Sequence, residues 1–216
     1  MINVYAFKWA PPFAQGLVRD LRVRWALEEA GLAYEEKLIG FEDASSEGYR
    51  ALQPFSQVPA YEEDGLVLFE TGAIVLHIAR RSDVLMPADS RQEAQVTTWM
   101  FAALNTVEQP IQTFGLMDLF NKGPAWDALR PTVIEMIEKR LDALAQELKD
   151  NDYLVGRFSA ADLLMTTVLR ILRNTDLVER RPVLDAYKKR NEDRPAFQKA
   201  IADQIAAFER HAPVAA

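Results

Sequence analysis

Glu70 and Thr71 stand where a β-type run, Leu66–Phe69, gives way to an apolar helical pattern that begins near Ile74. A helix N-terminus offers free N–H groups and a positive dipole end, so it binds anions. Thr71 is expected to be the N-cap and adds a hydroxyl. Glu70 adds a negative charge one residue away. The pair therefore suits a zwitterion, with the carboxylate at the helix end and the ammonium group on the acid.

Val58 and Pro59 open the strand that precedes this one. Apolar runs at 58–61 and 66–69 flank Asp64-Gly65, a strong hairpin signal because both residues tolerate positive φ. The Val58-Pro59 bond is a candidate cis peptide, which would turn the backbone of Val58 outward. An extended peptide could then pair with it as an added strand.

The motif Gln57-Val58-Pro59, followed eleven residues later by Glu70-Thr71, resembles the glutathione-binding half of a cytosolic glutathione transferase. The usual pair in that family is Glu-Ser, and Thr71 is a conservative variant. The resemblance implies that these five residues bind glutathione as a co-substrate. The alternative is a plain hairpin in which Thr71 only caps a helix.

A second mark of the family lies late in the chain. Ser159-x-x-Asp162 is a capping box variant, with the acid reaching back to the amide of the cap residue. Phe158 and Leu163 occupy the hydrophobic staple positions, and Gly156 precedes the box. We expect Ser159 and Asp162 to have a structural role, in the folding of a helical domain.

The remaining pattern predicts the elements that hold these residues. It favours strands at 2–7 and 34–39, with a helix at about 14–30 that ends at Gly31. The β-α-β then β-β-α order resembles a thioredoxin-like domain over residues 1–82. After a linker at 83–91, residues 92–216 are predicted to be all helical, with helices near 96–111, 129–148, 183–190 and 195–210. The fold class is therefore an α/β thioredoxin-like N-terminal domain followed by an all-α C-terminal domain.

The group that would activate the thiol is missing from its usual place. Glutathione transferases lower the pKa of the bound thiol, ordinarily about 8.5, with a Tyr, Ser or Cys near the first strand or helix. Residues 6–33 contain none of Ser, Thr, Tyr or Cys. The candidates are Tyr5, a Gln15 amide and the Arg19 charge, or backbone amides at the helix start. Trp9 and Phe13 would form the wall of the site.

Pro11 stands where the omega-like class has its cysteine, in a Pro-Pro-Phe-Ala segment that resembles Cys-Pro-Phe-Ala. This argues against a disulfide-forming thiol-transferase reaction. By resemblance, the electrophile pocket lies between the domains and is lined by Trp99, Met100, Phe101, Leu104 and Asn105. The two histidines, His77 and His211, have no acidic or histidine neighbour at helical ligand spacing, so we expect no metal.

The composition and charge of the chain limit the kinds of partner that we expect it to bind. The chain has 216 residues, is 49% hydrophobic and carries a formal charge of −7, so a basic footprint for nucleic acid or an anionic membrane is absent. No apolar run approaches the roughly 18 residues of a membrane span, and no secretory signal is visible. We therefore expect a cytoplasmic protein. The resemblance further implies a homodimer, with contacts on the third and fourth helices.

The leading functional hypothesis is conjugation of glutathione to a small hydrophobic electrophile by a stabilised thiolate. One alternative is a non-catalytic module that binds glutathione, a hydrophobic ligand or a protein partner. The other keeps an enzyme but changes the reaction to glutathione-dependent peroxide reduction or isomerisation. A test of thiol activation would distinguish the leading hypothesis from the non-catalytic module. A panel of substrates would distinguish it from peroxide reduction or isomerisation.

Overall fold

The structure is a computed structural model that describes residues 1–213, in two compact units. The first unit comprises Met1–Leu85 together with the chain from Arg194 onward, and the second comprises Met86–Asp193. The first contains a four-stranded sheet in the order β2-β1-β3-β4. Its strands are β1 (Ile2–Phe7), β2 (Tyr34–Ile39), β3 (Ala60–Glu63) and β4 (Leu66–Leu68). β1 pairs with β2 in parallel, and the other two pairs are antiparallel. This is the predicted thioredoxin-like arrangement.

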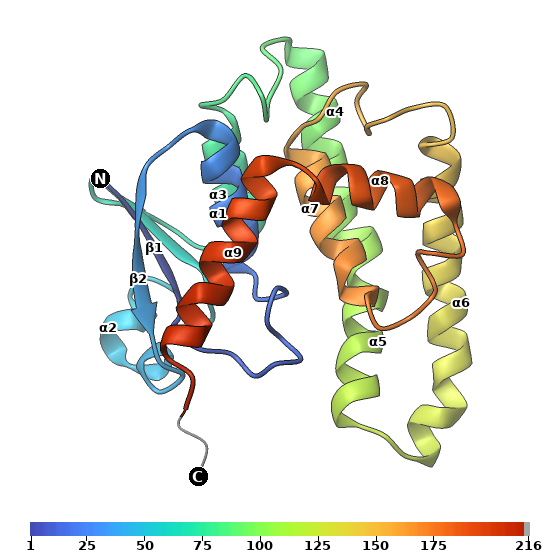
Figure 1. Cartoon of the computed structure of the whole chain (residues 1–216), viewed down its shortest axis with the longest axis horizontal. Coiled ribbons are helices and arrows are strands. Elements are labelled where there is room, and N and C mark those ends of the chain that lie inside the picture. Colours follow the sequence, from blue (N-terminus) through green and yellow to red (C-terminus); the bar gives the residue numbers. More distant parts are fainter. Residues whose placement is uncertain (214–216) are drawn as a thin grey trace. The chain divides into compact units, whose positions relative to one another are not determined.

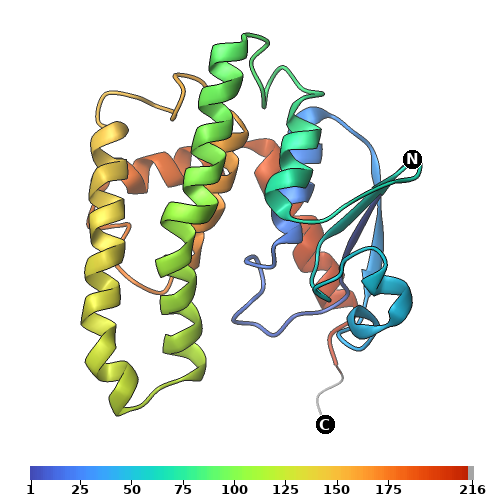
Figure 2. The same cartoon turned by 180° about the vertical axis from the view of Figure 1, so that it is seen from behind.

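Helices cover both faces of this sheet (Figures 1 and 2). α1 (Asp20–Ala30), α3 (Thr71–Ala79) and α9 (Pro195–Arg210) lie on one face, and the short α2 (Glu47–Arg50) lies on the other, preceded by a 3₁₀ turn at Asp43–Ser45. Residues along β1 alternate between the two faces, as strand geometry requires. Ile2, Val4 and Ala6 are buried, and the residues between them are half-buried.

The hairpin forms where it was predicted, although β3 begins two residues later than the apolar run. Asp64 and Gly65 form the turn with φ values of 49° and 87°. Tyr61 pairs with Leu68 in the antiparallel register. Continuing that register by two residues places Pro59 opposite Glu70. The cis-proline end of one strand and the start of α3 therefore meet at the same end of the hairpin.

The prediction for the first helix is right at its end and wrong at its start. Gly31 closes α1 with φ of 65°, as expected from a glycine C-cap. The helix begins at Asp20 rather than near Ala14. Residues 8–19 form a series of turns instead, and Gly16 has a φ of 74°, which a right-handed helix does not allow.

The second unit is helical, as the sequence predicted. Its elements are α4 (Ser90–Phe101), a π-helical segment (Ala102–Val107), α5 (Glu108–Phe120), α6 (Pro124–Glu147), α7 (Ala160–Leu169), a 3₁₀ turn (Arg170–Leu172) and α8 (Pro182–Glu192). α7 is buried at all ten of its residues and packs against α4 and the π-helical segment. It is the core of this unit.

A proline follows the π-helical segment and accounts for its irregular hydrogen bonding. Pro110, in the first turn of α5, lacks the N–H that would bond to the carbonyl of Thr106 four residues earlier. Arg140 of α6 donates its Nε–H to that carbonyl at 3.1 Å. The helix therefore changes its pitch here without leaving the carbonyl of Thr106 unsatisfied.

The predicted capping box at the start of α7 is present. The Asp162 carboxylate accepts hydrogen bonds from the Ser159 amide and hydroxyl, both at 2.9 Å. It also accepts bonds from the Leu154 amide at 3.0 Å and the Tyr187 hydroxyl at 2.9 Å. Since all of these groups are buried, Asp162 joins the loop before α7, α7 itself and α8.

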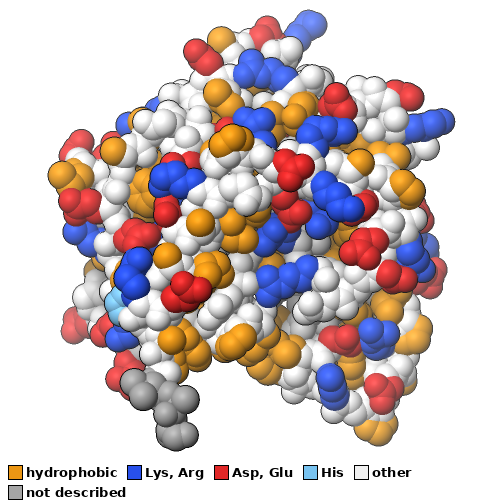
Figure 3. Space-filling view, viewed as in Figure 1, with side chains coloured by type: hydrophobic (Ala, Val, Ile, Leu, Met, Phe, Trp, Pro, Cys, Tyr) orange, Lys and Arg blue, Asp and Glu red, His pale blue; other side chains and the backbone are white. Residues whose placement is uncertain are grey.

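α9 groups with the first unit, because its contacts run to α1. The sequence had placed all of residues 92–216 in one helical domain, and the pattern of a single amphipathic helix does not reveal which unit its apolar face will meet. Within the described part of the chain, every helix is too short or too polar to cross a membrane. On the face drawn in Figure 3, acidic and basic side chains are interspersed, without a continuous basic patch.

Candidate functional site

Glu70 and Thr71 form the junction between β4 and α3. Glu70 is exposed and has a φ of 66°, an uncommon value for a residue other than glycine that turns the chain sharply into the helix. It is Glu70 that occupies the N-cap, and Thr71 is the first helical residue, so the expectation that Thr71 caps α3 is wrong by one position. The Thr71 hydroxyl instead accepts a hydrogen bond from Arg22 of α1 at 3.3 Å.

The Val58-Pro59 bond is cis, as the sequence suggested. Two side chains hold the loop that leads into it. Gln53 is buried, and its Oε1 accepts hydrogen bonds from the amides of Phe55 at 2.7 Å and Gln57 at 3.2 Å. The Tyr49 hydroxyl donates to the Gln57 carbonyl at 2.7 Å, and burial raises the pKa of Tyr49 far above its usual value. Gln57 itself stays exposed, and Val58 and Pro59 are buried.

The hairpin register brings these two segments together at one edge of the first unit. The rings of Phe55 and Phe69, from the two segments, lie edge to face with centroids 6.1 Å apart. β1 ends at the same place, since Tyr5 pairs with Ala60. The loop that follows β1 therefore starts beside the cis-proline.

Tyr5 faces the opposite side of the sheet from α1 and α3. Its ring lies 5.8 Å from that of Tyr49 and packs in the small core under α2. Its hydroxyl donates to Glu62 at 2.9 Å. Burial and this hydrogen bond raise the pKa of Tyr5. The geometry separates the Tyr5 hydroxyl from Thr71, which weighs against Tyr5 as the thiol-activating group.

The loop at 8–19 carries the other predicted groups. Gln15 donates its side-chain amide to the Ala10 carbonyl at 3.0 Å. Arg19 precedes α1 and lies three residues before Arg22, so the two share one side of the helix. Because Arg22 reaches Thr71, that side is directed toward the start of α3. Trp9 is half-buried, and Phe13 is 45% exposed.

The predicted electrophile-pocket residues lie on α4 and the π-helical segment of the second unit. Met100 is 3% exposed and belongs to the interior of this unit. Phe101 is 57% exposed, Asn105 is exposed, and Trp99 and Leu104 are half-buried. Leu104 and Asn105 fall inside the π-helical segment, a type of irregularity that is frequent at functional sites.

Three residues near the site were not singled out from the sequence: Arg22, Tyr49 and Gln53. Arg22 lies between Arg19 and Arg24, a spacing typical of a solvated helix, yet it is 4% exposed. Tyr49 and Gln53 lie in a polar stretch with no periodic pattern. Neither residue carries a local signal that could have marked it from the sequence.

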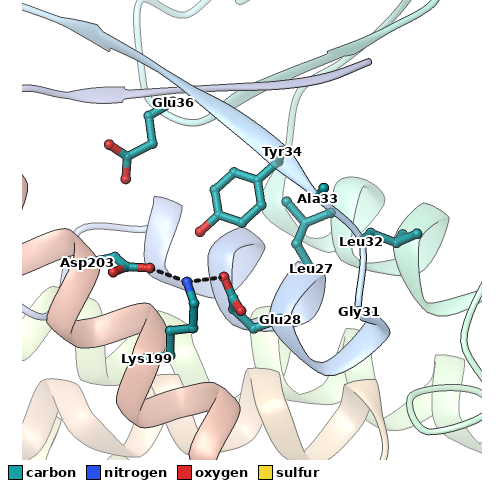
Figure 4. Close-up of a pocket in the computed structure, with 9 residues that line it drawn as sticks. All are labelled: Leu27, Glu28, Gly31, Leu32, Ala33, Tyr34, Glu36, Lys199 and Asp203. Carbon is teal, nitrogen blue, oxygen red and sulfur yellow. Dashed lines mark hydrogen bonds and ion pairs between the residues drawn. The ribbon is translucent and has the colours of Figure 1, made fainter.

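A cavity of about 520 Å³ lies elsewhere in the first unit, between the end of α1, the start of β2, and α9. Figure 4 shows its lining residues, with Lys199 held between Glu28 at 2.8 Å and Asp203 at 2.6 Å. Burial raises the pKa of Tyr34, above this pair, to about 12. None of the residues predicted to bind glutathione lines this cavity.

Known proteins resemble both units. The glutathione S-transferase N-terminal domain family model matches residues 15–80, and the corresponding C-terminal domain model matches residues 118–195. A glutathione S-transferase of Hyoscyamus muticus is 30% identical over 195 residues, covering 84% of this chain and 92% of that protein. The crystal structure of glutathione transferase F7 from Populus trichocarpa has a TM-score of 0.81 at 25% identity, covering 95% of this chain and 99% of that one.

A second solved structure, glutathione S-transferase-I bound with lactoylglutathione, has a TM-score of 0.78 at 25% identity and covers 93% of this chain and 98% of that one. The family models span both units in the expected order, and the relatives match nearly the full chain. The chain belongs to the cytosolic glutathione S-transferase family, and it is a transferase of that family.

Proposed function

We propose that the protein binds glutathione along residues 57–59 and at the start of α3, and that it conjugates the bound thiolate to small hydrophobic electrophiles. The observation that carries the proposal is the hairpin register, with Tyr61 opposite Leu68; its continuation by two residues sets cis-Pro59 opposite Glu70 at the N-terminus of α3. A glutathione S-transferase related in structure holds lactoylglutathione, which supports glutathione as the co-substrate.

Each part of glutathione has a matching group. The backbone of Val58 would pair with the cysteinyl residue as an added strand. The γ-glutamyl carboxylate would bind at the free amides of α3 with the Thr71 hydroxyl, and its ammonium group would meet the exposed Glu70. The Arg22 guanidinium, 3.3 Å from Thr71 Oγ1, adds positive charge beside the carboxylate. Gln57 is exposed at the entrance to this segment.

The thiolate would be stabilised from the loop at 8–19. Arg19 is the leading group, because it shares the side of α1 that reaches Thr71 through Arg22. Gln15 and the backbone amides near it are the second choice, and Trp9 with Phe13 would reduce the access of water. Tyr5 is the weakest of the three candidates, since its hydroxyl proton is given to Glu62.

The electrophile would be held by side chains of α4 and the π-helical segment. Phe101 offers the largest exposed apolar surface of the five predicted residues, and Trp99, Leu104 and Asn105 are at least partly accessible. Met100 would support them from the interior. A hydrophobic and aromatic lining with one amide is typical of sites for small apolar ligands.

We further propose that two copies pair in the cytoplasm as a homodimer. Phe55 is 65% exposed and its ring lies edge to face with that of Phe69, which is 37% exposed. Exposed aromatic pairs of this kind are typical of protein interfaces. Sedimentation of Phe55→Ser beside the unaltered protein tests this surface, and an unchanged dimer would exclude it.

The primary test is a calorimetric titration with glutathione at neutral pH, repeated in two buffers of different ionisation heat. The difference between the two heats gives the protons released on binding. Release of an appreciable fraction of a proton supports thiolate formation. Binding without release would favour a non-catalytic carrier, which the absence of Ser, Thr, Tyr and Cys from residues 6–33 would then explain. No binding would refute the proposed site.

A further inference from the structure

Gln204 is a fully buried polar residue near the end of the chain. It lies on α9 and is 0% exposed. Its Oε1 accepts a hydrogen bond from the Gly16 amide at 3.2 Å, and its Nε2 donates to the Val18 carbonyl at 3.1 Å and to Asp20 Oδ1 at 2.8 Å. One carboxamide thus holds three points of the segment that leads into α1.

That segment has little regular structure of its own. Its backbone is organised by turns, such as Ala14 N to the Pro11 carbonyl at 2.8 Å and Leu17 N to the Ala14 carbonyl at 2.9 Å. Gly16 has a φ of 74°, a conformation that a glycine adopts at little cost. Loops with few long-range bonds open at low free energy. The bonds from α9 therefore contribute much of what defines this conformation.

Asp20, the third partner, is itself anchored. Its Oδ2 accepts from Arg24 Nε at 2.6 Å, both side chains are 1% exposed, and Arg24 also pairs with Glu36 of β2. Gln204 therefore ties the loop to a carboxylate that is already fixed to the sheet. Arg19 lies between Val18 and Asp20, the two neighbours that Gln204 holds. Gln15 directly precedes Gly16.

We propose that Gln204 is a positioning residue for thiol activation: its carboxamide sets the conformation of residues 16–20 and thereby the placement of Arg19 and Gln15. This rests on the proposed function, in which the loop stabilises the thiolate of glutathione. Gln204 does not touch glutathione in this account. It acts through the loop, so it affects the pKa of the bound thiol more than the affinity for the peptide.

The matched pair of variants is Gln204→Met and Lys199→Met, both on α9. Lys199 also links α9 to α1, through Glu28 in the last turn of α1, and its other ion pair is with Asp203 of α9 itself (Figure 4). Lys199→Met therefore controls for weaker attachment of α9. Gln204→Asn, one methylene shorter, is the milder second variant and is used for every comparison if Gln204→Met does not fold.

Three readouts are measured: the pKa of bound glutathione from thiolate absorbance, kcat and KM for glutathione against pH, and hydrogen exchange of the Gly16 amide. Loss of the three bonds is expected to raise the bound thiol pKa by about one unit, which lowers the thiolate fraction about tenfold below that pKa. We expect kcat to fall with it, KM to change less than about threefold, and the Gly16 amide to exchange faster.

Lys199→Met should leave the thiol pKa and the Gly16 exchange unchanged. A folded Gln204 variant with the thiol pKa of the unaltered protein would overturn the inference, and so would an equal shift in Lys199→Met. If the unaltered protein itself does not lower the thiol pKa, the proposed function fails together with the inference. If the unaltered protein lowers the thiol pKa and only the expected change in the Gln204 variant is missing, the inference about Gln204 fails and the proposed function is unaffected.

Discussion

The Arg22 guanidinium, 4% exposed, lies 3.3 Å from the Thr71 hydroxyl, so α1 and α3 meet through a buried polar contact at the N-terminus of α3. Positive charge, free amides and a hydroxyl converge at this point. All three favour a carboxylate.

Removal of the Thr71 hydroxyl tests the carboxylate site. Thr71→Val keeps the shape of the side chain, so the expected change is about tenfold weaker glutathione binding, or about 1.4 kcal/mol. Thr71→Ser should bind within about threefold of the unaltered protein, because it keeps the hydroxyl. Calorimetric titration measures both. Equal affinity of the Val and Ser variants would remove the hydroxyl from the site.

Removal of the Arg19 charge tests thiol activation. Arg19→Ala should lower kcat about tenfold or more below the pKa of the bound thiol, while glutathione affinity stays within about threefold. The control is Arg91→Ala, which removes an equal charge from an exposed position on α4. Absorbance of the bound thiolate against pH separates the two variants. An unchanged titration curve in Arg19→Ala would exclude Arg19 and point to Gln15 or the backbone amides.

Tyr5→Phe should leave turnover within about twofold of the original value, because the Tyr5 hydroxyl lies on the α2 face and donates to Glu62. A small loss of stability, about 1 kcal/mol, is expected from the lost hydrogen bond. Steady-state kinetics and urea denaturation measure the two effects. A large fall in kcat with unchanged stability would restore Tyr5 as the activating residue.

Asp162, the N3 residue of the capping box of α7, should contribute more to stability than the cap residue Ser159. Asp162→Ala leaves the amides of Leu154 and Ser159 and the Tyr187 hydroxyl without their buried acceptor, at a cost of about 3 kcal/mol or more. Ser159→Ala keeps that acceptor and should cost about 1 kcal/mol. Urea denaturation measures both. Asp150→Ala, at an exposed position, is the control, and a matching loss there would refute the role of the box.

Asp118 should make the stability of the fold depend on pH in the acidic range. Hydrogen bonds from Arg130 at 2.8 Å and from the Trp126 indole at 2.7 Å hold the pKa of Asp118 below its usual value. A depressed carboxyl pKa stabilises the fold above the unfolded-state pKa, about 3.9, and this contribution is lost as pH falls through the folded-state pKa. The effect should stay below about 1 kcal/mol, because the pair is partly exposed.

Asp118→Asn should therefore lower stability near neutral pH and leave it nearly unchanged in acid, where the original side chain is protonated. Denaturation midpoints at a series of pH values measure this difference. Asp150→Asn serves as the control, with an unchanged profile. An equal loss of stability at every pH would show that the loss does not come from the ion pair between Asp118 and Arg130.

The local signals in the sequence predicted much of this protein. Asp64-Gly65 predicted the hairpin turn, and Val58-Pro59 predicted the cis peptide. Ser159 with Asp162 predicted the capping box, and Gly31 predicted the end of α1. Each of these depends on residues within a few positions of one another, where φ preferences and short-range hydrogen bonds decide the outcome.

The tertiary structure decided what depends on partners far along the chain. The amphipathic pattern of residues 14–30 predicted one continuous helix, but bonds to Gln204, more than 180 positions away, accompany the turns before Asp20. The place of Tyr5 in the first strand made it a candidate for thiol activation, but the fold packs its ring in the small core under α2. The sequence by itself therefore determined the family, the hairpin, the capping box of α7 and the glycine that ends α1, whereas the N-cap of α3 lies one residue before the predicted one. The start of α1 and the attachment of α9 came from the fold, because long-range hydrogen bonds and packing between distant helices carry no local signature.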